Sequence, residues 1–171
     1  IILQWVEKNN RYSSKSWEID IIAKRIIAWI SNSKLTYEDA GPVYRGKFDN
    51  IIKKQINHLI NEIEKDKLVD NKMIGCAAII LAGLSYQDKD GYLFIGLNLL
   101  KKIIKFSLDS DGFPKSRNIR QLNFYLKYFV LIREWFKESQ NDIPEYIDEN
   151  IYYLGQAYAL FSQNNKRDFL F

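Results

Sequence analysis

Apolar residues recur at helical spacing in six successive runs, and this pattern constrains the fold more than any other feature of the sequence. The runs cover about residues 17–31, 44–65, 71–86, 92–108, 119–139 and 144–161. In the first run Ile19, Ile22 and Ile26 fall on one stripe of a helix. No strand-like alternation of apolar and polar residues separates the runs. The sequence therefore predicts an all-α protein.

The third run is apolar nearly all round, which is typical of a helix buried on several sides. Lys72 and Gln87 bound it, and it is far too short to cross a bilayer, so we expect no membrane span. Short connectors make neighbouring helices antiparallel. Such helical hairpins suit a bundle, a helical-repeat solenoid or a toroid, although no period of about thirty residues recurs.

The length of 171 residues predicts one domain with one sizeable core. The net charge of +4, from 25 basic and 21 acidic residues, is below the density of a dedicated nucleic-acid binder. We therefore expect no nucleic-acid partner. The first residue is Ile1 rather than Met, so we expect a cut N-terminus.

The sequence contains a single cysteine and a single histidine, Cys76 and His58. Cys76 lies in the apolar third run, where a buried and inert thiol is expected. His58 lies beside an apolar stripe and is expected to be structural and partly buried. Because one His and one Cys cannot form the usual metal-ligand cluster, we expect neither a metal site nor a cofactor.

A polar, kinked segment at residues 109–118 separates two strongly apolar runs. Gly112 can take a positive φ, and Ser116 or Asn118 can cap the following helix. One interpretation is a simple connector between helices. The other is a site for an anionic ligand, lined by Lys115, Ser116 and Arg117.

Aromatic residues make up 15% of the chain and gather in two places, near the start of the chain and along the fifth run. Trp5, Tyr12 and Trp17 form the first group, although core packing explains most such rings. In the fifth run, Tyr125 lies about two helical turns beyond Arg117. A tyrosine near an arginine is a feasible proton-transfer group, because the cation favours the phenolate.

Four motifs occur in the order found in one protein family. They are Trp17 followed by residues 25–30 (RIIAWI), Ala82-Gly83-Leu84, Asp111-Gly112 with Ser116-Arg117, and residues 143–146 (IPEY). On these motifs the chain resembles the N-terminal helical domain of the heparinase II/III-like family of bacterial polysaccharide lyases. The resemblance spans nearly the whole chain.

The resemblance implies an incomplete ring of helical hairpins, an (α/α) toroid, over residues 1–163. Residues 164–171 would begin a linker to a β-sandwich domain that this chain lacks. The groove of such a toroid holds an acidic, uronate-containing polysaccharide, which the family cleaves by β-elimination. Because a second catalytic histidine of the family comes from the β-sandwich, this chain alone is expected to be inactive.

The same resemblance supplies candidate site residues. In the family, the Asp-Gly segment is followed by a Tyr-His pair that here falls on about Gln121 and Leu122, neither of which can transfer a proton. Tyr125, one turn further, is the candidate acid or base. Asn71 is the candidate that neutralises the uronate, together with Lys115, Ser116 and Arg117 as substrate-binding residues. The competing hypothesis is a non-catalytic all-α scaffold or interaction domain.

Overall fold

The computed structural model describes residues 2–9, 11–13, 15–86 and 91–164. The helices are α1 (Ile2–Asn9), α2 (Ile19–Ser31), α3 (Pro42–Glu62), α4 (Val69–Ser85), α5 (Tyr92–Ser107), α6 (Ile119–Glu138) and α7 (Glu145–Asn164). A π-helical turn at Lys34–Glu38 precedes α3, and a 3₁₀ turn at Ile63–Lys65 follows it. The expected linker at residues 164–171 lies outside the described residues except for Asn164, where α7 ends.

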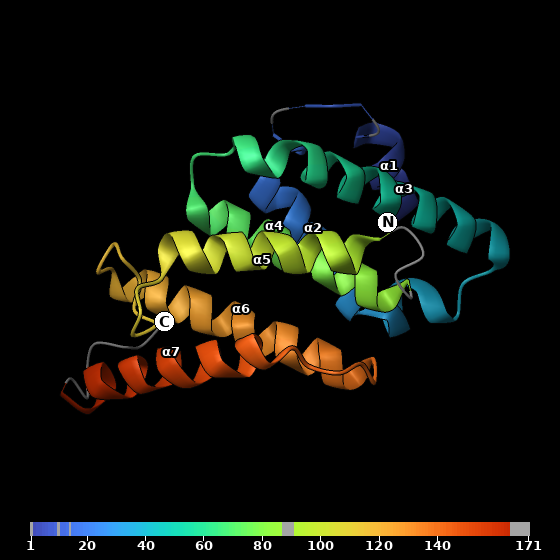
Figure 1. The fold of residues 1–171 in the computed structure, drawn as a ribbon. Helices are drawn as coiled ribbons and strands as arrows, with labels where there is room; N and C mark the ends of the chain where they lie inside the picture. Colours follow the sequence, from blue (N-terminus) through green and yellow to red (C-terminus); the bar gives the residue numbers. More distant parts are fainter. Residues whose placement is uncertain (1, 10, 14, 87–90, 165–171) are drawn as a thin grey trace. The chain divides into compact units, whose positions relative to one another are not determined.

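The described residues contain no strand and only one isolated β-bridge, between Leu108 and Pro114. The all-α prediction is therefore confirmed, while the toroid arrangement stays a prediction. The chain divides into two compact units, residues 1–98 and 99–171, with the boundary inside α5. The first unit contains α1 to α4 and the second contains α6 and α7 (Figure 1).

The core of the first unit is built around α4, which packs chiefly against α2. Every side chain of α4 from Met73 to Leu84 is buried, as its uniformly apolar sequence predicts. The stripe Ile22, Ala23 and Ile26 of α2 is also fully buried. The burial of α4 thus follows from its uniformly apolar composition, and the burial of one face of α2 follows from the helical spacing of its apolar residues.

Two glycines allow α4 and α5 to approach closely. A Cβ added at Gly83 would lie 2.4 Å from the backbone nitrogen of Leu93, and one at Gly96 would lie 2.6 Å from Ile80 Cγ1. Neither distance is compatible with a side chain, so these positions require glycine. The Sγ of Cys76 donates a hydrogen bond of 3.1 Å to the carbonyl of Gly96 across the same contact.

A half-buried arginine, Arg25, ties α1 to the rest of the first unit. The guanidinium of Arg25 lies 4.1 Å from the centre of the Trp5 ring, which in turn packs edge-on against Trp29. Arg25 also donates hydrogen bonds to Gln55 Oε1 and to the carbonyl of Ser16. Burial lowers the pKa of Arg25 to about 10, which leaves the side chain charged at neutral pH.

In the second unit, α6 and α7 form a helical hairpin (Figure 1). The buried face of α6 carries a stripe at helical spacing, formed by Leu122, Tyr125, Phe129 and Ile132. Arg133 of α6 pairs with Asp148 of α7 at 2.6 Å on the outside of the hairpin. The predicted fifth and sixth runs therefore correspond to α6 and α7.

Candidate functional site

Asp109 organises the connector between α5 and α6, in the second unit. Its Oδ1 accepts hydrogen bonds from the backbone nitrogens of Asp111 and Phe113, at 3.1 and 2.8 Å. Its Oδ2 pairs with the guanidinium of Arg117 at 2.8 Å. Gly112 takes the expected positive φ, of 72°, and packs against Tyr153. One carboxylate thus holds the turn together from several sides.

The three predicted binding residues of this turn all have partners within it. Lys115 donates to the carbonyl of Lys105 at 2.9 Å, and the Ser116 hydroxyl donates to Gln121 Oε1 at 2.5 Å. Arg117 is engaged by Asp109, with 69% of its side chain still exposed. All three side chains are exposed to solvent. An anionic ligand would nevertheless have to compete with the contacts that stabilise the turn.

Of the two helix-capping candidates in this segment, Ser116 and Asn118, only Asn118 caps α6. Asn118 is the N-cap of α6, because its side chain accepts a hydrogen bond from the backbone nitrogen of Arg120 at 2.9 Å. Ser116 instead accepts a weaker bond of 3.3 Å from the Asn118 nitrogen. The connector interpretation accounts for the geometry of this turn.

Tyr125, the candidate acid or base, lies on the buried face of α6. Only 1% of the residue is exposed, and its ring packs against Phe124. A proton donor must come within hydrogen-bond reach of its substrate. In this conformation no ligand in solvent can contact Tyr125.

Asn71, the remaining candidate, belongs to the first unit, where it lines a pocket of about 550 Å³. We call this the acidic pocket; it is lined by Tyr12, Trp17, Glu18, Ile19, His58, Glu62, Lys65, Asp66 and Asn71. Its two walls are the segment that enters α2 and the junction of α3 with α4. Its size falls in the range of small-molecule sites, roughly 300–1,000 Å³.

An aromatic corner forms one side of the acidic pocket. The ring of His58 lies 5.2 Å from that of Trp17, edge to face, and 5.8 Å from that of Tyr12. Trp17 is almost fully buried, whereas 71% of Tyr12 is exposed. Tyr12 is therefore the ring that a ligand can reach.

Carboxylates dominate the charge of the pocket, with Glu18, Glu62 and Asp66 facing the single ammonium of Lys65. Asp66 is fixed by hydrogen bonds from Asn71 Nδ2 at 3.0 Å and the backbone nitrogen of Leu68 at 2.8 Å. A hydrogen bond from Lys65 lowers the pKa of Glu62, so this carboxyl is ionised at neutral pH. The pocket consequently favours neutral or positively charged ligands over anions.

Sequence reasoning grouped Tyr12 with Trp17, but it treated Asn71 and His58 separately from them and from each other. The carboxylates escaped notice because Glu18 and Asp66 are 48 positions apart in the sequence. The acidic cluster Glu62, Glu64 and Asp66, which begins one helical turn after His58, is the sequence feature that could have indicated this pocket.

A second polar cluster lies at the other end of α3, where Asp49 accepts hydrogen bonds from Tyr37 at 3.1 Å and Tyr86 at 3.0 Å. Burial, reinforced by the Asp49 charge, raises the pKa of both phenols. Both tyrosines therefore stay protonated near neutral pH and do not serve as bases. This cluster ties the π-helical turn and the end of α4 to α3.

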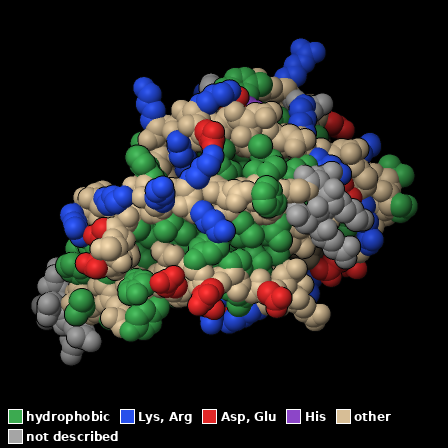
Figure 2. Space-filling view, in the orientation of Figure 1, with side chains coloured by type: hydrophobic (Ala, Val, Ile, Leu, Met, Phe, Trp, Pro, Cys, Tyr) green, Lys and Arg blue, Asp and Glu red, His purple; other side chains and the backbone are tan. Residues whose placement is uncertain are grey.

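No known family model, curated protein or solved structure matches this chain. Within the part of the chain that the structure describes, no three His, Cys, Asp or Glu side chains gather where they could hold a metal ion. No helix among those residues combines the length and apolarity needed to span a bilayer. On the face in Figure 2, Lys and Arg side chains are spread among apolar ones.

Proposed function

We propose that this chain is a non-catalytic helical domain that binds a neutral or positively charged glycan in the acidic pocket. The observation that carries the proposal is the placement of the exposed Tyr12 ring in one pocket with three carboxylates and the amide of Asn71. An aromatic ring can stack on the apolar face of a sugar. Carboxylates and amides accept and donate the hydrogen bonds that sugar hydroxyls or ammonium groups require.

The absence of catalysis is supported by the state of the residues that β-elimination would need. Tyr125 is buried in the hairpin of the second unit, and Arg117 is paired with the carboxylate of Asp109. A scaffold in which the turn is a helix cap and the aromatic rings are core accounts for both. The charge of the acidic pocket further disfavours a uronate ligand there, because like charges repel.

The proposal is tested by titrating the chain with tetrasaccharides of three kinds and following binding by calorimetry. A glucosamine tetramer and a neutral glucan tetramer should bind saturably, with the cationic sugar tighter, and a uronate tetramer should not bind. Tyr12→Ala should weaken binding about five- to tenfold, since an aromatic contact contributes about 1 kcal/mol. Tyr152→Ala, which removes an exposed tyrosine of α7, is the control.

Glu18→Gln removes one carboxylate without removing a cap, because Glu18 makes no side-chain cap hydrogen bond at the start of α2. It should weaken the glucosamine tetramer more than the neutral one. If no tetramer binds, or if Tyr12→Ala and Tyr152→Ala bind alike, the proposal is wrong.

A second candidate is the lyase-like binding of an acidic polysaccharide, together with a β-sandwich domain in a longer protein. It is favoured by the exposed Lys115 and Arg117 on one turn. A protein containing this chain and such a domain should then generate unsaturated products that absorb in the near ultraviolet. No absorbance gain across a panel of uronate-containing glycans would remove this candidate.

A further inference from the structure

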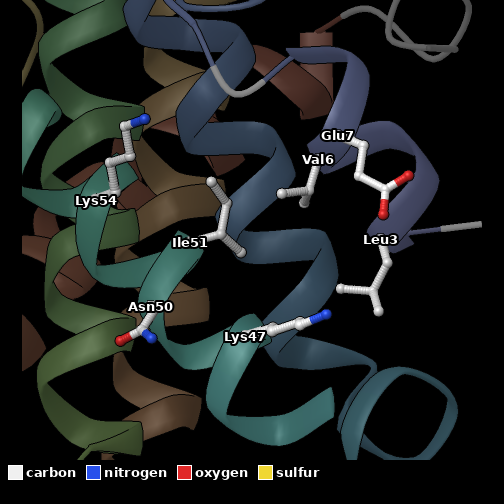
Figure 3. A pocket seen from close by; sticks show the side chains of 7 residues that line it. All are labelled: Leu3, Val6, Glu7, Lys47, Asn50, Ile51 and Lys54. Atoms are coloured by element: carbon white, nitrogen blue, oxygen red, sulfur yellow. The ribbon is translucent and has the colours of Figure 1, made fainter. Parts of the chain in front are cut away.

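A second pocket of about 320 Å³ lies between α1 and α3 in the first unit (Figure 3). Leu3 and Val6 of α1 and Ile51 of α3 supply its apolar lining. In Figure 3 the side chains of Val6 and Ile51 point toward one another across the space between the two helices. An apolar lining of this kind gains free energy when it contacts an aliphatic chain instead of water.

The wall formed by α1 is held at two points. Trp5 packs under the Arg25 guanidinium at 4.1 Å, and the carbonyl of Asn9 accepts a hydrogen bond of 3.0 Å from Trp17 Nε1. Asn9 also donates through its side chain to the carbonyl of Trp5. The pocket is therefore formed before any ligand arrives, which avoids an ordering cost on binding.

Two lysines flank the apolar lining. Lys47 and Lys54 are seven residues apart on α3, and Ile51 lies between them at positions i+4 and i−3, so all three share one face of the helix. The opposite wall contributes one carboxylate, that of Glu7. Figure 3 shows Lys47 extending from α3 toward α1. The polar rim thus carries more positive than negative charge.

We propose that this α1–α3 pocket binds a medium-chain aliphatic carboxylate. The apolar lining accepts the hydrocarbon chain, and the ammonium of Lys47 pairs with the carboxylate head. The volume lies at the lower end of ligand pockets, about 300 Å³, which suits a short chain rather than a long lipid. This site differs from the acidic pocket in its sign of charge and does not depend on it.

The test titrates the chain with octanoate, hexanoate and octylamine, and follows backbone amide resonances of α1 and α3. Octanoate should bind saturably and about fifteenfold more tightly than hexanoate, because each of its two additional methylenes contributes about fourfold when buried. Octylamine has the same hydrocarbon chain with the opposite charge and should bind at least tenfold more weakly than octanoate. Equal binding of octanoate and octylamine would refute the proposal, as would an absence of saturable octanoate binding.

Two variants assign the site. Lys47→Glu reverses the charge at the rim and should reduce octanoate affinity at least tenfold while improving that for octylamine. Lys67→Ala changes an exposed lysine outside the pocket and should leave both affinities unchanged. An unchanged thermal transition shows that Lys47→Glu is folded. If Lys47→Glu and Lys67→Ala bind octanoate equally, the carboxylate is not held here.

Discussion

Arg117 has a left-handed backbone conformation, with φ of 55°. This conformation costs a residue other than glycine about 1 kcal/mol. The ion pair to Asp109 contributes about 0–1 kcal/mol in return, because the Arg117 side chain is largely exposed. The strain and the pair therefore nearly cancel.

We predict that Arg117→Gly is at least as stable as the original protein, whereas Arg117→Ala is less stable than Arg117→Gly by about 1 kcal/mol. Both variants lose the ion pair, so their difference isolates the backbone term. Urea unfolding followed by circular dichroism measures both free energies. Equal stability of the two variants would mean that the backbone at residue 117 is not strained.

Individual residues show where sequence reasoning succeeds. The positive φ of Gly112 and the cap at Asn118 follow from local chemistry, since glycine lacks a Cβ and asparagine can accept from the helix backbone. The left-handed conformation of Arg117 does not follow from local chemistry, because arginine has no preference for a positive φ. The burial of Tyr125 follows from its place in the apolar stripe of α6 with Phe129 and Ile132, and only the family resemblance favoured a catalytic role for it.

Arg25, which is half-buried, and Gln55, which is fully buried, form a hydrogen-bonded pair whose contributions to stability we expect to be coupled. We predict that Arg25→Met and Gln55→Leu are each destabilised by about 2 kcal/mol, because each leaves a polar partner unpaired. The double variant should be more stable than the sum of the single effects by about 1 kcal/mol or more. Urea unfolding of all four proteins gives this coupling energy.

A matched control is Lys24→Ala, on the same helix, which removes an exposed ion pair with Asp20. Its effect should stay within about 0.5 kcal/mol. Strict additivity of the Arg25 and Gln55 substitutions would show that their hydrogen bond makes no specific contribution.

At the scale of elements, the contact between α4 and α5 depends on the missing side chain at Gly83. We predict that Gly83→Ala destabilises the protein by about 2 kcal/mol or more, because the added methyl would meet the Leu93 backbone, which cannot rotate away. Gly46→Ala, at an exposed position near the start of α3 with nothing within 4 Å, should stabilise it by about 0.5–1 kcal/mol. Thermal unfolding compares the two. A neutral Gly83→Ala would show that the helices can separate at little cost.

The six predicted runs correspond to α2 through α7, because long amphipathic helices carry a repeated signal. The eight-residue helix α1 was missed, since two turns are too short to establish a period. Its position depends on Trp5 meeting Arg25, a contact that only the folded structure reveals. The two pockets were likewise not predicted, because each combines residues that are distant in the sequence.

At the scale of the whole molecule, the two units share α5, which begins in the first and ends in the second. Dividing the chain at residues 98 and 99 would cut a helix and leave unpaired backbone groups on both sides. Apolar residues recur along the whole length of α5, so the sequence does not reveal the boundary between the units. The one-domain prediction accordingly rested on length alone.

Cys76 reports on the integrity of the first unit. Burial raises the pKa of its thiol well above the ordinary value of 9.0. We predict that Cys76 reacts with a thiol reagent at pH 8 at least a hundredfold more slowly than in urea-unfolded protein, because the thiolate is the reactive form. Rapid reaction of the native protein would show that α4 opens on its own.

The burial of α4 along residues 73–84 has one more consequence. Its amide hydrogens can exchange with deuterated solvent only when the first unit opens around them. Both pockets lie in that unit, so a ligand that binds either one raises the free energy of opening. Deuterium uptake by α4, the innermost helix of this unit, can therefore serve as a common gauge of occupancy at both pockets.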